Sequence, residues 1–258
     1  MKRTLFLLIA LLSMQMATAQ LSEYSAHEYI VAQDTLPYRL LAPIKANPDA
    51  KYPLVVFLHG SGERGNDNEK QLTWGGQMFL NPTIRDKYRS YVVFPQCPES
   101  QFWGYESSPS KITPDSIPVL EEPVTCTRML RALVKDLTAR YNLDPKRIYF
   151  VGLSMGAMGV YDYACRYPSG VAAAVAICGA VNPSRLKEAK GVKWSIYHGD
   201  ADPVVPVEAS RAAYKALKAC YADVQYHEFI GCGHNAWNPA FNTKDFFKWM
   251  FDQSISTR

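Results

Sequence analysis

The chain has 258 residues, of which 48% are hydrophobic and 20% are charged, so it is long and apolar enough to form an α/β domain with a full core. This composition excludes a disordered chain, a collagen-like fibre and a small disulfide-dense protein. The formal net charge is only +4, partly from Lys2 and Arg3, which indicates no nucleic-acid partner and favours a small-molecule substrate.

The first segment has the pattern of a secretory signal peptide. Lys2 and Arg3 are followed by an apolar run over residues 5–12 and then by the small-residue triplet that ends at Ala19. The apolar run is much shorter than the roughly 20 residues needed to span a bilayer, and no later stretch of the sequence is long and apolar enough. We therefore expect residues 1–19 to be cleaved near Ala19 and residues 20–258 to form one domain, located in the periplasm or secreted.

Apolar runs typical of strands alternate with helical patterns along the rest of the chain. Two β-like runs, at residues 29–32 and 36–41, flank a polar turn and predict an antiparallel hairpin. Six further runs predict buried strands, at residues 53–58, 91–94, 148–153, 172–178, 192–198 and 224–230. Helical spacing of apolar residues occurs at 121–141, 155–167, 207–219 and 243–251. This alternation predicts a mostly parallel, twisted sheet of about eight strands with helices on both faces.

The sharpest local signal is the pentapeptide Gly152-Leu-Ser154-Met-Gly156, which follows a strongly apolar run and precedes a helical pattern. A G-x-S-x-G sequence between a strand and a helix is typical of a nucleophile elbow, in which the two glycines make room for a sharp turn. The turn presents the serine hydroxyl at the helix N-terminus. We therefore predict that Ser154 is a catalytic nucleophile.

A serine hydroxyl is a poor nucleophile at neutral pH, so it needs a base and a carboxylate that orients the base. In this architecture the base follows the acid in the chain, and two histidines lie downstream of the stretch at residues 198–206. His227 lies inside a predicted strand, which indicates a structural role, whereas His234 lies in the loop at the end of that strand, where sites of open α/β sheets form. The candidate acids are Asp200, Asp202 and Asp223. We predict His234 as the base and Asp202, in the loop beyond a strand, as the acid.

The loop His59-Gly60-Ser61-Gly62 follows the predicted strand at residues 53–58, and its glycines allow backbone N–H groups to point into the site. We predict an oxyanion hole formed by the backbone N–H groups of Ser61 and Met155. His59 precedes the nucleophile in the chain, so we expect it to brace this loop rather than to act as the base.

Together these stretches resemble the α/β-hydrolase superfamily over essentially the whole mature chain. Within it, the segments at residues 59–65 (HGSGERG), 95–98 (PQCP) and 198–206 are similar to secreted carboxylesterases, a group akin to feruloyl esterases and often labelled predicted peptidases. The resemblance implies an α/β-hydrolase fold and an acid at Asp202. Asp200, Asp202 and His198 have the residue types of a metal site, but hydrolysis by a triad needs neither a metal ion nor a cofactor. The sequence departs from lipases with a His-Gly-Gly-Gly motif, because Ser61 replaces a glycine, and from dienelactone hydrolases, which have cysteine at the elbow.

The stretch at residues 179–192 is too short for a large helical cap domain, so we expect an open pocket shaped by loops. Four aromatic residues on or near these loops are candidates for stacking on a sugar or on an aromatic acyl group: Trp74, Trp103, Tyr105 and Trp237. The alternative is that these side chains pin the loops to the body of the protein.

Glu63 and Arg64 are adjacent charged residues in the loop that follows the first buried strand. They either pair with each other or recognise a polar group of the substrate, and the sequence leaves both interpretations open.

Six cysteines lie in the mature chain, and an extracytoplasmic compartment permits disulfides. Cys97 follows a predicted strand and Cys126 lies at the start of a predicted helix, so both belong to the same end of the sheet. A Cys97–Cys126 bridge that closes the long intervening loop is the one disulfide that we expect.

These observations predict a secreted serine hydrolase that cleaves carboxylic esters, such as aryl, feruloyl or acetyl esters of carbohydrates, through an acyl-enzyme. A serine peptidase with the same triad is the main alternative, although nothing in the sequence resembles a gating domain. A catalytically silent carbohydrate-binding module is less favoured, because all triad members are present in order. The expected partner is a small-molecule or saccharide ester, with no nucleic acid, membrane span or cofactor.

Overall fold

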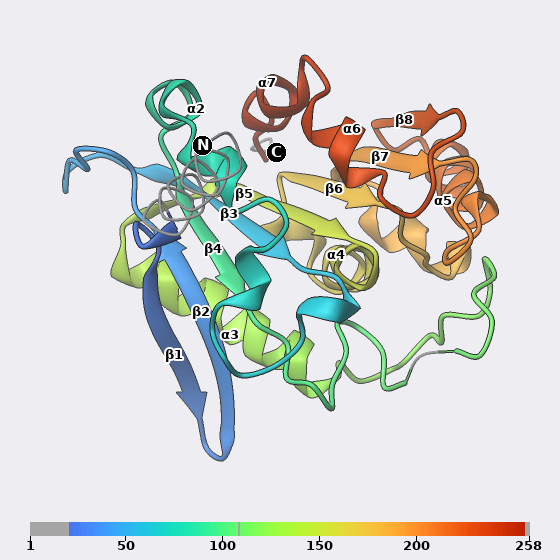
Figure 1. Cartoon of the computed structure of the whole chain (residues 1–258), viewed down its shortest axis with the longest axis horizontal. Coiled ribbons are helices and arrows are strands. Elements are labelled where there is room, and N and C mark those ends of the chain that lie inside the picture. The colour runs from blue at the N-terminus through green and yellow to red at the C-terminus, as the bar shows by residue number, and fades with distance from the viewer. Residues whose placement is uncertain (1–20, 108, 256–258) are drawn as a thin grey trace, which may run out of the picture.

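The computed structural model describes residues 21–107 and 109–255, and the segment expected to be a signal peptide lies outside the described residues. The described chain forms an eight-stranded open sheet, with helices packed on it (Figure 1). The strands are β1 (Ser25–Val31), β2 (Asp34–Leu41), β3 (Tyr52–Leu58), β4 (Tyr91–Pro95), β5 (Leu143–Leu153), β6 (Ala173–Ile177), β7 (Lys193–Gly199) and β8 (Val224–Phe229). The helices are α2 (Pro82–Lys87), α3 (Thr125–Arg140), α4 (Met155–Arg166), α5 (Val207–Ala219), α6 (Trp237–Phe241) and α7 (Phe246–Phe251).

The strands are ordered β1-β2-β4-β3-β5-β6-β7-β8 across the sheet. β1 pairs with β2, and β2 with β4, in antiparallel fashion, and all the remaining pairs are parallel. Three of the inner strands, β3, β4 and β6, are buried at every residue, which explains why they read in the sequence as unbroken apolar runs. The predicted mostly parallel sheet of about eight strands is confirmed, and the chain has the α/β-hydrolase fold.

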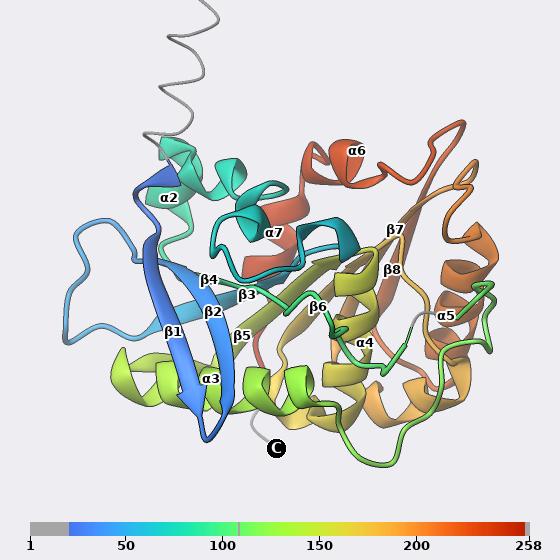
Figure 2. The ribbon, with the colours of Figure 1, turned by 60° about the horizontal axis from the view of Figure 1, so that its bottom comes forward.

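Helices cover both faces of the sheet. Figure 2 shows α3, α4 and α5 beneath the sheet, and α2, α6 and α7 above it. The core on the first side includes Leu133 of α3 and Val160 of α4, and the core on the second side includes Phe246 and Met250 of α7. Each face of the sheet therefore has its own hydrophobic core, and the inner strands are shielded from water on both sides, whereas the edge strands β1 and β8 are more exposed.

The helix expected from residue 121 begins only at Thr125, as α3. The guanidinium group of Arg166 donates hydrogen bonds to the carbonyl oxygens of Leu120 and Glu121, at 2.8 and 2.9 Å. It also donates a weaker one, at 3.3 Å, to the carbonyl oxygen of Glu122. These carbonyls are thereby taken by a side chain from another helix, and the segment stays outside α3.

Two connections between elements lie at the edge of the sheet where the parallel strands end. Between β4 and α3 the described residues contain turns and bends but no helix or strand. Between β6 and β7 the described chain has only the short 3₁₀ helix η5 (Pro183–Ala189), so this region contains no large cap domain.

Among the described residues, no helix is both long and apolar enough to cross a membrane.

Candidate active site

Ser154 lies at the sharp turn between β5 and α4, with φ 53° and ψ −121°. This is a conformation that residues with a side chain rarely adopt. The two flanking glycines explain how the chain can reach it, since a Cβ on Gly152 would lie 2.4 Å from the carbonyl oxygen of Gly156. A Cβ on Gly156 would lie 2.0 Å from the carbonyl oxygen of Leu58 in β3. The turn is therefore the strained elbow that the pentapeptide predicts, and it places the serine at the N-terminus of α4.

His234, in the loop that follows β8, contacts the serine and an aspartate through its two ring nitrogens. Its Nε2 lies 2.9 Å from Ser154 Oγ and its Nδ1 lies 2.7 Å from Asp202 Oδ2. Because an ionised carboxylate can only accept a hydrogen bond, Nδ1 carries the proton and Nε2 is left to accept the proton of the serine hydroxyl. The structure thus brings the three residues singled out in the sequence into one hydrogen-bonded chain.

The carboxylate of Asp202 is fully buried and is held on both oxygens. Oδ1 accepts hydrogen bonds from the backbone N–H groups of Val204 and Val205, at 2.8 and 3.0 Å. Oδ2 lies 2.7 Å from His234 Nδ1 and 3.3 Å from His198 Nε2. Burial alone would raise the pKa of Asp202, but these hydrogen bonds hold it well below its usual range. The group is therefore a fixed negative charge behind the imidazole.

His198 is a partner of Asp202 to which the sequence reasoning gave no supporting role. It is buried at the end of β7, and its Nε2 also lies 2.9 Å from the carbonyl oxygen of Val205. Its Nδ1 lies 2.7 Å from Ser210 Oγ of α5. The sequence signal is the histidine at a strand end four residues before the aspartate, a spacing that lets both reach into the same turn.

The other candidate acids and the second histidine have different partners. Asp200 Oδ1 accepts a hydrogen bond from the backbone N–H of Gly231, at 2.6 Å, and so anchors the loop that carries the candidate base. Asp223 pairs with Lys193, at 3.2 Å. His227 stacks on Tyr197 within the sheet, with ring centroids 4.7 Å apart. None of the three bonds to the serine or to the candidate base.

The loop after β3 lies against the serine. A Cβ built on Gly60 would be 3.7 Å from Ser154 Cβ. The backbone N–H groups of Ser61 and Met155 form no hydrogen bond within the described part of the chain. Two free amide donors beside a candidate nucleophile are what an oxyanion hole requires, so both remain the candidates for it.

His59 is buried behind this loop and has both ring nitrogens occupied. The backbone N–H of Cys97 donates to Nε2 at 3.0 Å, so the ring proton is on Nδ1, which donates to the carbonyl oxygen of Gly60 at 2.6 Å. Burial lowers its pKa to about 4. The imidazole ties the loop after β3 to the loop after β4, which is the bracing contact that the sequence suggested.

Two of the four aromatic residues expected to bind substrate lie in the interior instead. Trp103 is 1% exposed and packs against Gly159 of α4 and the ring of His59, while Tyr105 is 4% exposed and stacks on Phe102. The burial of Trp103 and Tyr105 fits the alternative that these side chains pin the loop to the body, because the long loop that follows β4 folds back and its large apolar rings are buried there.

The other two aromatic residues do border the site. Trp237, at the start of α6, lies edge-on to the ring of His234 at 5.7 Å, and Trp74 lies 5.3 Å from Trp237. Trp74 is 36% exposed, so part of its ring is available to a ligand. Trp74 and Trp237 therefore remain candidates for substrate contact.

Glu63 and Arg64 do not pair with each other. Arg64 donates to the carbonyl oxygens of Ser61 and Glu99 and lies over the ring of Phe102. Glu63 Oε1 accepts a hydrogen bond from the indole N–H of Trp74, at 3.2 Å. Of the two interpretations left open by the sequence, an ion pair between these neighbours is excluded.

The expected bridge between Cys97 and Cys126 is not formed, since both are free thiols in the structure. Their Sγ atoms are nevertheless 3.4 Å apart and buried. The two cysteines expected at the same end of the sheet are therefore neighbours, although no disulfide bond joins them.

A soft metal ion would find one set of three ligand atoms in the described chain. Cys178 Sγ, a carboxylate oxygen of Asp202 and a ring nitrogen of His234 lie within 4.8 Å of one another. Burial raises the pKa of the Cys178 thiol, and both ring nitrogens of the imidazole already have partners. The set is better described as the serine–histidine–aspartate chain with a buried thiol beside it.

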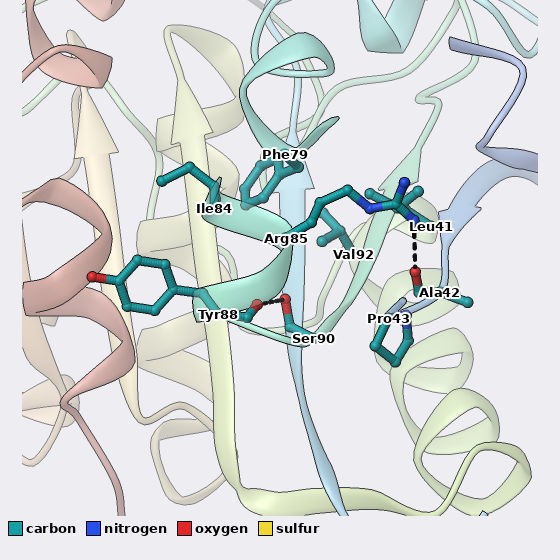
Figure 3. Close-up of a pocket in the computed structure, with 9 residues that line it drawn as sticks. All are labelled: Leu41, Ala42, Pro43, Phe79, Ile84, Arg85, Tyr88, Ser90 and Val92. Atoms are coloured by element: carbon teal, nitrogen blue, oxygen red, sulfur yellow. Dashed lines mark hydrogen bonds between the residues drawn. The ribbon is translucent and has the colours of Figure 1, made fainter. Parts of the chain in front are cut away.

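A small hollow lies far from this chain of residues, between α2 and the strands β2 and β4 (Figure 3). Its lining includes Arg85 of α2 and Val92 of β4, and none of the serine, histidine or aspartate residues described above. It encloses only about 10 Å³, which is hardly room for one water molecule. It is therefore not a ligand site.

Comparison with known proteins gives consistent matches. A model of the phospholipase/carboxylesterase family matches residues 41–248. The crystal structure of a thermostable esterase matches this chain with a TM-score of 0.84 and a sequence identity of 32%. The match covers 92% of this chain and 64% of that one. The protein NocK of Nocardia uniformis subsp. tsuyamanensis, which is named as an esterase, is 26% identical over 193 residues, covering 73% of this chain.

This chain spans 52% of the length of NocK. A ferulic acid esterase of Anaeromyces mucronatus, solved in complex with ferulic acid, is 15% identical with a TM-score of 0.66, and the match covers 89% of this chain and 90% of that one. At this identity the likeness concerns the fold alone.

Proposed function

Since this chain belongs to the phospholipase/carboxylesterase family, we propose that it hydrolyses carboxylic esters with Ser154 as the nucleophile. The single observation that carries the proposal is the hydrogen-bonded chain from Ser154 through His234 to Asp202, at 2.9 and 2.7 Å. Such a chain lets an imidazole remove the hydroxyl proton while a buried carboxylate stabilises the imidazolium that forms.

The proposed reaction has two halves. Ser154 Oγ attacks the ester carbonyl carbon as its proton moves to His234 Nε2, and the oxyanion that forms accepts hydrogen bonds from the backbone N–H groups of Ser61 and Met155. The imidazolium returns the proton to the leaving alcohol, which departs and leaves an acyl-serine. Water then attacks the acyl group with the same imidazole as base, and the acid is released with the serine hydroxyl restored. Asp202 remains ionised throughout.

The proposed substrates are aryl, feruloyl or acetyl esters, including those of carbohydrates. The open edge of the sheet, without a large cap between β6 and β7 in the described chain, supports access for a bulky ester. The two tryptophans beside His234 offer rings on which an aromatic acyl group or a sugar can stack.

A covalent probe tests the proposal directly. The mature protein is incubated with a fluorophosphonate and, separately, with p-nitrophenyl acetate, alongside Ser154→Ala and the exposed-serine control Ser184→Ala. We expect labelling and ester turnover by the wild type and by Ser184→Ala, and neither by Ser154→Ala. Labelling that persists in Ser154→Ala would contradict the assignment. Turnover of peptides at rates above those of esters would identify a peptidase instead.

We also propose that the protein acts outside the cytoplasm, after removal of residues 1–19. This proposal rests on the basic start, apolar run and small-residue triplet of the sequence alone. The intact mass of the protein purified from a secreting host should correspond to a chain that begins at Gln20. A mass that retains the first 19 residues would contradict it.

A further inference from the structure

The carboxylate of Glu63 lies beside the serine. A methyl group built on Cα of Gly60 would be 3.1 Å from Glu63 Oε2 and 3.7 Å from Ser154 Cβ, so the carboxylate and the serine flank the same point of the loop. On the outer side of this loop, a Cβ on Gly62 would have nothing within 4 Å. The loop is therefore open to solvent at Gly62, and Glu63 and Ser154 are each only half-buried.

Two indole rings continue the wall from the carboxylate to the candidate base. The indole N–H of Trp74 donates to Glu63 Oε1 at 3.2 Å and so orients the carboxylate, whose Oε2 lies on the Gly60 side. The backbone N–H groups of Gly60 and Glu63 also face the carboxylate. The Trp74 and Trp237 rings lie 5.3 Å apart, and Trp237 lies edge-on to the ring of His234. Three segments that are distant in the sequence thus form one continuous surface around the reacting groups.

The charge of Glu63 has no counterion in the described chain. No basic side chain pairs with it, and the guanidinium of the adjacent Arg64 is directed at the carbonyl oxygens of Ser61 and Glu99. Burial raises the pKa of Glu63, against hydrogen bonds that lower it. An unpaired negative charge this near the serine opposes the oxyanion that forms during ester hydrolysis, unless a donor on the substrate offsets it.

On the basis of the proposed esterase function, we propose that Glu63 is a specificity-determining residue that accepts a hydrogen bond from a hydroxyl group of the substrate, close to the scissile ester. Trp74 holds the carboxylate in place, and the exposed part of its ring, with that of Trp237, forms the stacking face of this subsite. The substrates that fit are esters of polyols or saccharides rather than simple alkyl esters. Carboxylates and indole rings together suit such ligands, because they provide hydroxyl acceptors beside an apolar face.

A hydroxyl group fits this environment better than an ammonium group. The raised pKa of Glu63 means that its neutral form is more accessible than for an exposed carboxyl, and a hydroxyl can bond to either form, whereas a cation needs the ionised one. The two ligand chemistries make opposite predictions for charged and neutral esters of the same shape, so one experiment separates them.

The experiment measures kcat/KM for two pairs of acetate esters. 2,3-Dihydroxypropyl acetate and propyl acetate differ only in two hydroxyl groups, and acetylcholine and 3,3-dimethylbutyl acetate differ in charge at nearly equal shape. The enzymes are the wild type, Glu63→Met, which removes the acceptor at similar length, Glu63→Gln, which keeps a neutral acceptor, and the control Glu99→Gln, which removes a carboxylate outside the subsite. Thermal unfolding of each variant confirms that it is folded.

We expect the wild type and Glu99→Gln to prefer the dihydroxy ester over propyl acetate by about 10-fold to 100-fold, which is the worth of one hydrogen bond to a charged group. The ratio should fall to near one in Glu63→Met and to an intermediate value in Glu63→Gln. An equal loss on both esters, with the ratio unchanged, would overturn the proposal and assign Glu63 to holding the loop.

A preference for acetylcholine over its neutral analogue that exceeds the hydroxyl preference would also overturn it, in favour of a cation subsite. A wild-type enzyme that cleaves both members of the hydroxyl pair equally well would refute the subsite and leave the esterase function intact. A wild type that cleaves no ester and does not react with fluorophosphonate would refute the esterase function itself.

Discussion

Two imidazoles lie at the edge of the sheet where the parallel strands end, and the structure gives them opposite properties. His59 follows β3 and is 1% exposed, with both ring nitrogens bonded to backbone groups. His234 follows β8, its side chain is 21% exposed, and its nitrogens face a carboxylate and a hydroxyl. The same residue type is therefore a brace in one loop and a proton acceptor in the other.

The difference lies in the partners rather than in the position along a strand. A backbone N–H and a backbone carbonyl cannot exchange protons with a substrate, so a ring between them can only hold two loops together. A buried carboxylate and a serine hydroxyl form a path along which a proton can move. The role of a histidine near a site is thus decided by the groups that its two ring nitrogens face.

The largest expected effect comes from removing the carboxylate behind His234. In Asp202→Asn the amide would donate towards Nδ1 and favour the wrong imidazole tautomer, so kcat for p-nitrophenyl acetate should fall by about 10⁴-fold. Asp200→Asn is the matched control, two residues away and with the same change in charge. Its loss should be far smaller, because Asp200 only anchors the loop through Gly231. Equal losses in the two variants would show that Asp202 has no special role.

The next effect concerns stability on the His59 side. The pKa of His59 is lowered to about 4 from 6.5, so between these values the unfolded chain binds a proton that the folded chain does not. The free energy of unfolding should be highest above pH 6.5 and should fall by about 3 kcal/mol as the pH is lowered to 4. Urea titrations of the wild type and of His59→Asn over this range measure the contribution.

In His59→Asn this dependence on pH should be much weaker, whatever the absolute stability of the variant. His227→Asn serves as the comparison, because burial also lowers the pKa of His227. His227 is only half buried, so its replacement should reduce the pH dependence of the free energy of unfolding by less than the replacement of His59 does. Parallel curves for the wild type and His59→Asn would contradict the account of the buried imidazole.

The smallest effect is a covalent bond that would stiffen the His59 side alone. Refolding in oxidised glutathione should join Cys97 to Cys126, as the two thiols give up their hydrogens and glutathione disulfide is reduced to two thiols. The Sγ atoms are already 3.4 Å apart and need to approach to about 2.05 Å. We expect a gain of about 2 kcal/mol in the free energy of unfolding.

Peptide maps under non-reducing and reducing conditions identify the bond, with Cys126→Ser as the control that cannot form it. Cys97 should then be found either alkylated in reduced protein or linked to Cys126 in oxidised protein. A linkage of Cys97 to any other cysteine after refolding would refute the prediction.

Local patterns were sufficient where the physical cause is local. The buried strands are recognisable as apolar runs because both faces of the sheet are covered, and the elbow at Ser154 is recognisable because a sharp turn needs glycine on either side. The short helices α2 and α6 escaped the sequence analysis, since five or six residues carry too little periodicity to stand out.

Long-range contacts decided the rest. The start of α3 is delayed by the side chain of Arg166, which lies on another helix. Trp103 was a candidate for stacking on substrate or for pinning its loop, and the fold of that loop against α4 buries it. The pairing of Glu63 with Arg64, which the sequence left open, is absent because each side chain bonds to a different loop.

The sequence by itself determined the chemistry that is available at this edge of the sheet: a serine at an elbow, a histidine and an aspartate in loops beyond strands, and the order of these residues along the chain. Only the tertiary structure decided which nitrogen faces which oxygen, which aromatic rings are buried, and that Glu63 lies beside Ser154. The physical reason is that side-chain periodicity and turn preferences act over a few residues, whereas hydrogen bonds and burial depend on segments that meet only after the sheet has formed.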